Sequence, residues 1–161
     1  MFYFLGSTAA FLLYHLAVHP DKQEILYKEI CKVIGPTGDL TEAALAKMKY
    51  MKAVQFESQR ILPAIFGTSR YFEKDITVGG FRIPKGTVVV RNGAFASMDP
   101  DNFTDPDKFL PERWLRGHEA RHNADSFANI PFGHGARYSF LMVLVLRLKM
   151  TFQSLYWTKI C

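Results

Sequence analysis

A glycine-rich segment near the end of the sequence has the residue types of a ligand-binding loop. It reads PFGHGARYS and contains Phe132, Gly133, Gly135 and Arg137, followed by Ser139. Glycines let a bare backbone approach a flat ligand closely, and an arginine can pair with an anionic group. The segment therefore predicts a loop that holds a flat, anionic ligand. However, Ser139, at the position expected to bind that ligand, offers only a hydroxyl group.

A second chemical pattern is the pair Glu57 and Arg60, which are three residues apart in an apolar stretch. On a helix these two side chains share one face and can form an ion pair. A charged pair among apolar neighbours usually needs a further polar partner. Arg113, in the sequence PERW, is the candidate, and a Glu–Arg–Arg triad would fix the surrounding irregular chain to the helix through bidentate hydrogen bonds.

A third pattern, His118-Glu119-Ala120-Arg121-His122, has the H-E-x-x-H spacing of zinc peptidases. On a helix both imidazoles would face one zinc ion, with the glutamate as general base. However, the segment follows a glycine and precedes Asn-Ala-Asp, which disfavours a helix. The only candidates for a third ligand are Asp125 and His134, so a zinc peptidase is kept as a remote alternative.

The elements that must position these residues are read from periodicity. Apolar residues at helical spacing predict helices over 1–19, 20–35, 41–49 and 50–62. From Arg70 the pattern changes to short strands, interrupted by Gly79-Gly80 and Pro84-Lys85-Gly86. Residues 99–117 predict an ordered but irregular connection. The fold class is therefore mainly α with a small β region.

Composition sets wider limits. The chain has 161 residues and a formal net charge of +5, without the dense Lys/Arg run expected of a nucleic-acid-binding protein. Its two cysteines, Cys31 and Cys161, cannot form a disulfide framework.

The apolar residues 1–18 lack the basic start of a signal peptide, and we expect a core helix, with membrane association as the alternative. We expect His15 and His19 to cap and solvate the end of that helix.

The ordered trio of E-x-x-R, PERW and FGHGAR resembles the C-terminal portion of the haem-thiolate monooxygenases, the cytochrome P-450 family. The resemblance extends from about Leu13 to Tyr138, and is strongest to the mitochondrial branch. It implies haem as cofactor, with Glu57, Arg60 and Arg113 as the triad that supports the haem pocket. It also implies that the loop contacts the porphyrin through Phe132, Gly133, Gly135 and Arg137, the arginine pairing with a propionate. Arg70 is either a second propionate partner or a solvated charge.

The sequence also departs from this family. The family places its iron-binding cysteine at the position of Ser139, and a neutral hydroxyl cannot supply the thiolate's electron density. Leu141 replaces a family glycine, and residues 139–161 form a divergent apolar tail, which suggests an alternative exon or a shifted reading frame. Residues 1–138 would then be a partial haem-thiolate domain that begins in a remnant of the distal helix. There only Thr8 could serve as the proton-delivering alcohol.

The resemblance implies an electron donor of the ferredoxin or reductase type and a small lipophilic substrate, for which Ile65 to Ser69 are the only candidate lining. Lys52 matches one ferredoxin contact position, whereas Phe56 replaces a second lysine. The implied location is the mitochondrial inner membrane, or alternatively the endoplasmic reticulum membrane. We expect an oxidoreductase relative that is truncated and catalytically impaired. The alternative is a non-enzymatic isoform that binds a partner.

Overall fold

The computed structural model describes residues 2–35, 41–119 and 127–131. Four helices come first: α1 (Phe2–Val18), α2 (Pro20–Ile34), α3 (Glu42–Lys47) and α4 (Lys49–Ile61). Strands β1 (Gly67–Tyr71), β2 (Ile76–Val78), β3 (Phe81–Ile83) and β4 (Val88–Asn92) follow, and then the short helix α5 (Gly93–Ser97) and the 3-10 helix η1 (Pro111–Trp114). The expected class, mainly α with a small β region, is confirmed.

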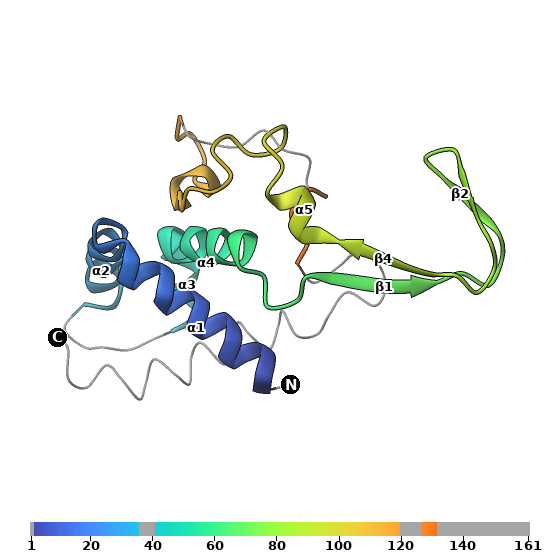
Figure 1. Ribbon diagram of the computed structural model, residues 1–161. Helices are drawn as coiled ribbons and strands as arrows, with labels where there is room; N and C mark the ends of the chain where they lie inside the picture. The colour runs from blue at the N-terminus through green and yellow to red at the C-terminus, as the bar shows by residue number, and fades with distance from the viewer. Residues whose placement is uncertain (1, 36–40, 120–126, 132–161) are drawn as a thin grey trace.

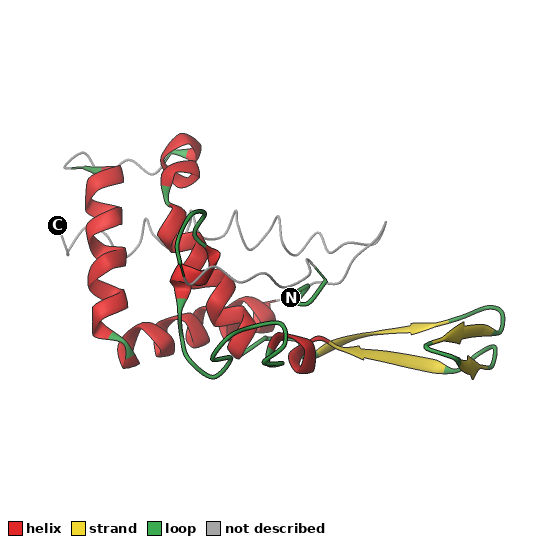
Figure 2. Cartoon of the chain, turned by 90° about the horizontal axis from the view of Figure 1, so that it is seen from above, coloured by secondary structure: helices red, strands yellow, loops and turns green. Residues whose placement is uncertain are grey.

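The helices form one body and the strands form an arm that projects from it (Figures 1 and 2). Along the arm β1 pairs antiparallel with β4, from Gly67 opposite Asn92 to Tyr71 opposite Val88. At its tip β2 pairs with β3. The turn between β2 and β3 is Gly79-Gly80, and both residues have positive φ (56° and 85°), as a two-residue hairpin turn requires.

The first strand begins at Gly67, three residues before the predicted start at Arg70. The sequence Gly-Thr-Ser has little intrinsic strand preference, and pairing with β4 decides the outcome. A Cβ atom on Gly67 would lie 2.3 Å from the carbonyl oxygen of Arg91, so only glycine fits where the two strands approach each other.

The hydrophobic core lies where α1, α2 and α4 meet η1. Its buried residues lie on or next to these four helices and are Leu16, Leu26, Ile30, Ile34, Met48, Tyr50, Val54 and Phe109. Helix α4 is fixed at its start by Glu29 of α2, whose carboxylate accepts hydrogen bonds from the backbone N–H groups of Tyr50 (2.8 Å) and Met51 (2.9 Å). An acidic group at this helix end also interacts favourably with the helix dipole.

Helix α1 is only partly a core helix. His15 and Leu16 are buried, but Leu13, Tyr14 and Val18 are more than half exposed. In the described part of the chain, α1 packs against α2 and α4. None of the helices that the structure describes combines the length and apolar character that a membrane crossing requires.

Candidate functional site

Glu57 is the centre of a polar network inside the protein. Its side chain is completely buried on α4, among the apolar neighbours noted in the sequence. Oε1 and Oε2 accept hydrogen bonds from Nη2 and Nε of Arg60, at 2.9 and 3.0 Å. The E-x-x-R pair therefore has the bidentate geometry that makes an arginine–carboxylate interaction strong.

Residues far along the chain complete this network. Arg113 of η1 donates from Nε to Glu57 Oε1 at 3.0 Å, so the structure brings the three members of the triad together. The backbone N–H of Leu110 donates to the same oxygen at 3.1 Å. The indole N–H of Trp114 donates to Oε2 at 2.8 Å. Trp114 was not anticipated from the sequence, although it directly follows Arg113.

The two arginines use their remaining donors on the irregular connection. Arg60 binds the carbonyl oxygens of Ser97 (2.8 Å) and Pro106 (2.7 Å). Arg113 binds those of Thr104 (2.9 Å) and Asp105 (3.2 Å). Five donors therefore converge on one carboxylate, and the guanidinium groups reach the backbone of residues 97–106. Because both guanidinium groups bind Glu57 and also the backbone of this connection, the network fixes the connection to α4, as predicted.

The burial of these charges makes the arrangement demanding. Glu57 and Arg60 are 0% exposed and Arg113 is 1% exposed. Two buried positive charges face one negative charge. The excess positive charge is offset by backbone carbonyl dipoles and by the Phe103 ring, whose centroid lies 5.1 Å from the Arg60 guanidinium carbon. A buried ion pair of this kind is stable only when its remaining polar atoms are satisfied. The network is therefore a positioning device, and it leaves Glu57 no free lone pair for acid–base chemistry.

A second polar cluster lies beside the first. Glu112 Oε1 accepts hydrogen bonds from Lys22 Nζ and from the Tyr50 hydroxyl, both at 2.9 Å. Burial alone would raise the pKa of Glu112, but the hydrogen bonds from Lys22 and Tyr50 hold that pKa below its ordinary value. Burial and then the bond to Glu112 raise the pKa of Tyr50. No sequence pattern links these three residues, which are up to 90 positions apart.

The prediction that His15 caps and solvates the helix end is wrong. His15 is 5% exposed, and its ring stacks on Phe109 at 4.6 Å between centroids with an interplanar angle of 1°. Burial, followed by the neighbouring His19, lowers the pKa of His15. His19 is half-buried, and its Nδ1 lies 2.9 Å from the His15 carbonyl oxygen. Because η1 and the preceding chain fold back over α1, the imidazole becomes part of the core.

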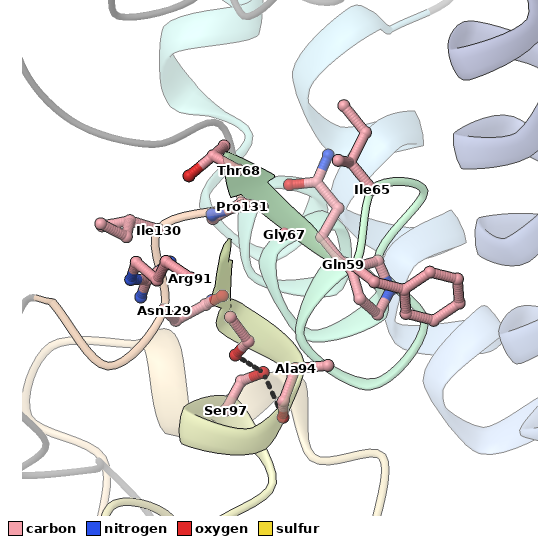
Figure 3. Close-up of a pocket in the computed structure, with 13 residues that line it drawn as sticks. Gln59, Ile65, Gly67, Thr68, Arg91, Ala94, Ser97, Asn129, Ile130 and Pro131 are labelled. Carbon is pink, nitrogen blue, oxygen red and sulfur yellow. Dashed lines mark hydrogen bonds between the residues drawn. The ribbon is translucent and has the colours of Figure 1, made fainter. Parts of the chain in front are cut away.

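The segment 127–131 leads into the predicted loop and borders a recess at the base of the arm. Arg91 Nη2 donates to the carbonyl oxygen of Phe127 at 2.8 Å and holds this segment against β4. Figure 3 shows Arg91 and Asn129 on one side of the recess and Gln59 and Ile65 on the other. Of the candidate substrate-lining residues, those from Ile65 to Thr68 line this recess.

The other predicted residues are scattered. Arg70 lies exposed on β1, and its Nη1 donates to the carbonyl oxygen of Ser69 at 2.9 Å. Thr8 is half-buried on α1. Lys52 is exposed on α4, and nearby Phe56 is 37% exposed with its ring 5.4 Å from that of Trp114. The structure therefore does not bring Arg70 or Thr8 to the triad.

Several predictions fall outside the described residues. These concern the loop residues Phe132, Gly133, Gly135, Arg137 and Ser139, and the zinc candidates His122, Asp125 and His134. His118 and Glu119 are described and lie exposed after η1, outside any helix. Among the described residues, no group of three His, Cys, Asp or Glu side chains could hold a metal ion.

Comparison with known proteins identifies a family for most of the chain. The sequence model of the family described as Cytochrome P450 matches residues 6–138. Human mitochondrial sterol 26-hydroxylase is 37% identical over 135 residues, which cover 82% of this chain and 25% of that protein. Mouse mitochondrial 1,25-dihydroxyvitamin D(3) 24-hydroxylase is 37% identical over 132 residues, which cover 82% of this chain and 25% of that protein. Human cytochrome P450 3A7 is 35% identical over 132 residues, which cover 82% of this chain and 26% of that protein. The chain spans about a quarter of the length of the curated relatives it matches.

Proposed function

Because the chain belongs to the cytochrome P450 family, we propose that it is a haem-monooxygenase relative in which oxygen activation is impaired. The family activity is that of an oxidoreductase that inserts one oxygen atom from O2 into a small lipophilic substrate. Residues 1–138 would form the partial haem-thiolate domain and residues 139–161 a divergent tail. The observation that carries the proposal is Ser139, at the position of the family's iron-binding cysteine.

The chemistry of the available donors supports this proposal. A thiolate pushes electron density toward the iron and favours cleavage of the O–O bond. A serine hydroxyl stays neutral at physiological pH and gives no such push. Of the two cysteines, Cys31 is half-buried on α2, whereas the segment that leads into the loop lies at the base of the arm (Figure 1). Ser139 and Cys31 thus do not offer a thiolate to haem in this loop, and Cys161 lies outside the described residues.

The remaining site residues would act on the cofactor's surroundings. We infer that Glu57, Arg60 and Arg113 support the haem pocket by fixing residues 97–113 to α4. Phe132, Gly133, Gly135 and Arg137 would contact the porphyrin, and Arg70 is a candidate for a propionate. Thr8 would be the distal alcohol.

Partners and location are inferred from the relatives. Several of these are mitochondrial proteins by name, including a sterol 26-hydroxylase. We propose a ferredoxin-type or reductase donor that reaches the exposed Lys52, and the mitochondrial inner membrane as the location, with the endoplasmic reticulum membrane as the alternative.

The test is spectroscopic. The purified chain is loaded with haem, reduced and exposed to carbon monoxide, in parallel with Ser139→Cys. We expect the unmodified chain to lack the red-shifted Soret band of thiolate ligation, because no sulfur lies at that position. A thiolate-type band from the unmodified chain would overturn the proposal.

A second candidate, a non-enzymatic form that binds a partner, is favoured by exposed apolar side chains on the first two helices. These are Leu13, Tyr14, Val18, Ile25 and Tyr27, each more than 40% exposed. Apolar surface of this kind is typical of interaction sites. Concentration-dependent self-association, measured by sedimentation, would distinguish this candidate from a monomer that only binds haem. Zinc content measured on the same sample would test the remote peptidase alternative.

A further inference from the structure

The imidazole of His15 is a buried titratable group that the proposed function does not use. Only 5% of its surface is exposed. Its Nε2 is shielded from solvent and has no hydrogen-bond partner among the described residues. In the protonated ring both nitrogens carry an N–H donor, so a charged donor at Nε2 would be buried without an acceptor, which is costly. The stability of this arrangement therefore depends on the protonation state of His15.

The ring of Phe109 lies directly on this imidazole. The two centroids are 4.6 Å apart and the ring planes differ by 1°. Phe109 is 4% exposed and belongs to the hydrophobic core together with Leu16, the neighbour of His15 on α1. The ring of His19 approaches Phe109 as well, with 5.0 Å between centroids. Phe109 thus anchors the chain that precedes η1 on the end of α1.

The residues on either side of Phe109 belong to the Glu57 network. The carbonyl oxygen of Lys108 accepts a hydrogen bond from Arg60 Nη2 at 3.3 Å. The backbone N–H of Leu110 donates to Glu57 Oε1 at 3.1 Å. Because these two bonds start from the neighbours of Phe109, movement of its ring away from α1 would pull on both of them. The contact at α1 and the buried network are therefore mechanically linked.

The charges that surround His15 oppose its protonation. Burial lowers the pKa of His15 most, and His19 on α1 and Arg60 on α4 lower it further, whereas Glu57 on α4 raises it. The Glu57 carboxylate already accepts from five donors, so it is not free to bind the imidazole. The connection contributes the uncharged ring of Phe109. A cation–π contact with that ring favours the imidazolium, but this effect is weaker than the cost of burying an unpaired charge.

We propose that His15 is a proton-sensitive contact that controls the Glu57 network. In the neutral state the imidazole packs on Phe109 and holds residues 108–110 in place. On protonation the imidazolium moves to water, Phe109 loses its stacking partner, and the hydrogen bonds at Lys108 and Leu110 weaken. The response begins as the pH falls below the ordinary pKa of histidine, 6.5. The contact involves no cofactor, so this inference stands independently of the proposed function.

The first experiment measures urea unfolding of the full chain between pH 7.5 and pH 5.5. The unfolded chain takes up a proton at His15 near pH 6.5, whereas the folded chain resists it, so stability is fully present above this pH and is lost below it. We expect the ratio of folded to unfolded chain to fall up to about tenfold more in the unmodified chain than in His15→Phe. That variant keeps an aromatic ring against Phe109 and has no nitrogen to protonate. His118→Gln, which removes an exposed histidine, should behave like the unmodified chain.

The second experiment separates local release from global unfolding, by NMR of the full chain with labelled histidine. The ring protons of His15 lie over the face of Phe109, so we expect their signals to be shifted upfield at pH 7.5. This shift should disappear in step with protonation, while the methyl signals of the buried Val54 stay those of the folded chain. Phe109→Leu should abolish the shift at every pH and so assigns it.

The NMR titration uses the unmodified chain, so it tests the proposal even if His15→Phe does not fold. Three results would overturn the proposal. The first is a His15 ring that titrates while it keeps its upfield shift. The second is an upfield shift that persists until the whole chain unfolds. The third is an equal dependence of stability on pH in the unmodified chain and in His15→Phe.

Discussion

The junction of α4 with η1 and the tip of the strand arm both contain arginine–carboxylate pairs, but in opposite surroundings. Glu57, Arg60 and Arg113 are excluded from water and share five donors at one carboxylate. Asp75 and Arg82 on the arm form a pair of 2.6 Å whose side chains are 46% and 78% exposed. The same chemical groups therefore fix tertiary structure at the junction of α4 with η1, whereas on the arm they form an exposed ion pair on a solvated hairpin. Burial and the number of shared donors, not the pair distance, decide which role the pair has.

The largest effect is expected from Glu57→Gln. The substitution keeps the side-chain volume but leaves two buried guanidinium groups without a negative charge, which costs about 3–5 kcal/mol of unfolding free energy. Urea unfolding followed by circular dichroism measures the change. Glu24→Gln is the matched control, because Glu24 pairs with Lys28 on the exposed face of α2. A loss below about 1 kcal/mol would mean that the network is not the support described for it.

A smaller effect is expected from Trp114→Phe. The variant removes one of the five donors to Glu57 and keeps an aromatic ring beside Phe56 and Phe103. A hydrogen bond to a charged group contributes about 1.5–3 kcal/mol, so the denaturant midpoint should fall by less than in Glu57→Gln. If both variants lost equal stability, the indole N–H would be as important as the carboxylate charge, and the donors could not be treated as separate contributions.

The Glu112 cluster predicts a dependence of stability on pH. The pKa of Glu112 in the folded protein lies below its ordinary value of 4.5 because Lys22 and Tyr50 donate to it. Its stabilising contribution is therefore fully present above that ordinary value and is lost as the pH falls through the folded-state pKa. Thermal melts between neutral pH and pH 3 should show a shallower decline for Glu112→Gln than for the unmodified chain. Parallel declines would show that Glu112 does not titrate in this way.

The smallest effect is expected on the arm. Arg82→Gln breaks the exposed pair with Asp75, and the urea midpoint should not move beyond experimental error, because solvent screens such pairs. A clear loss of stability here would break the contrast between the two regions.

These two regions also differ in how far the sequence predicts them. Glu57, Arg60 and Arg113 are recognisable because helical spacing joins the first two and the order of motifs suggests the third. Trp114, 57 positions from Glu57, and Lys22, 90 positions from Glu112, have no local signal, because only the folded chain brings them together. The helices follow from their apolar periodicity and from Pro20 and Thr41 at helix starts.

The errors have physical reasons as well. The start of β1 at Gly67 depends on pairing with β4, a tertiary effect that local preference does not contain. His15 resembles a solvated helix-end residue in the sequence, but Phe109, 94 positions later, covers it by stacking. In both cases the missing information is the position of a distant segment.

The most direct test of the central proposal is X-ray absorption at the iron edge of the haem-loaded full chain. We predict that no sulfur atom lies among the nearest ligands of the iron, because Ser139 presents an oxygen, and that Ser139→Cys introduces one. A sulfur shell around the iron in the unmodified chain would contradict the proposal that oxygen activation is impaired at this residue.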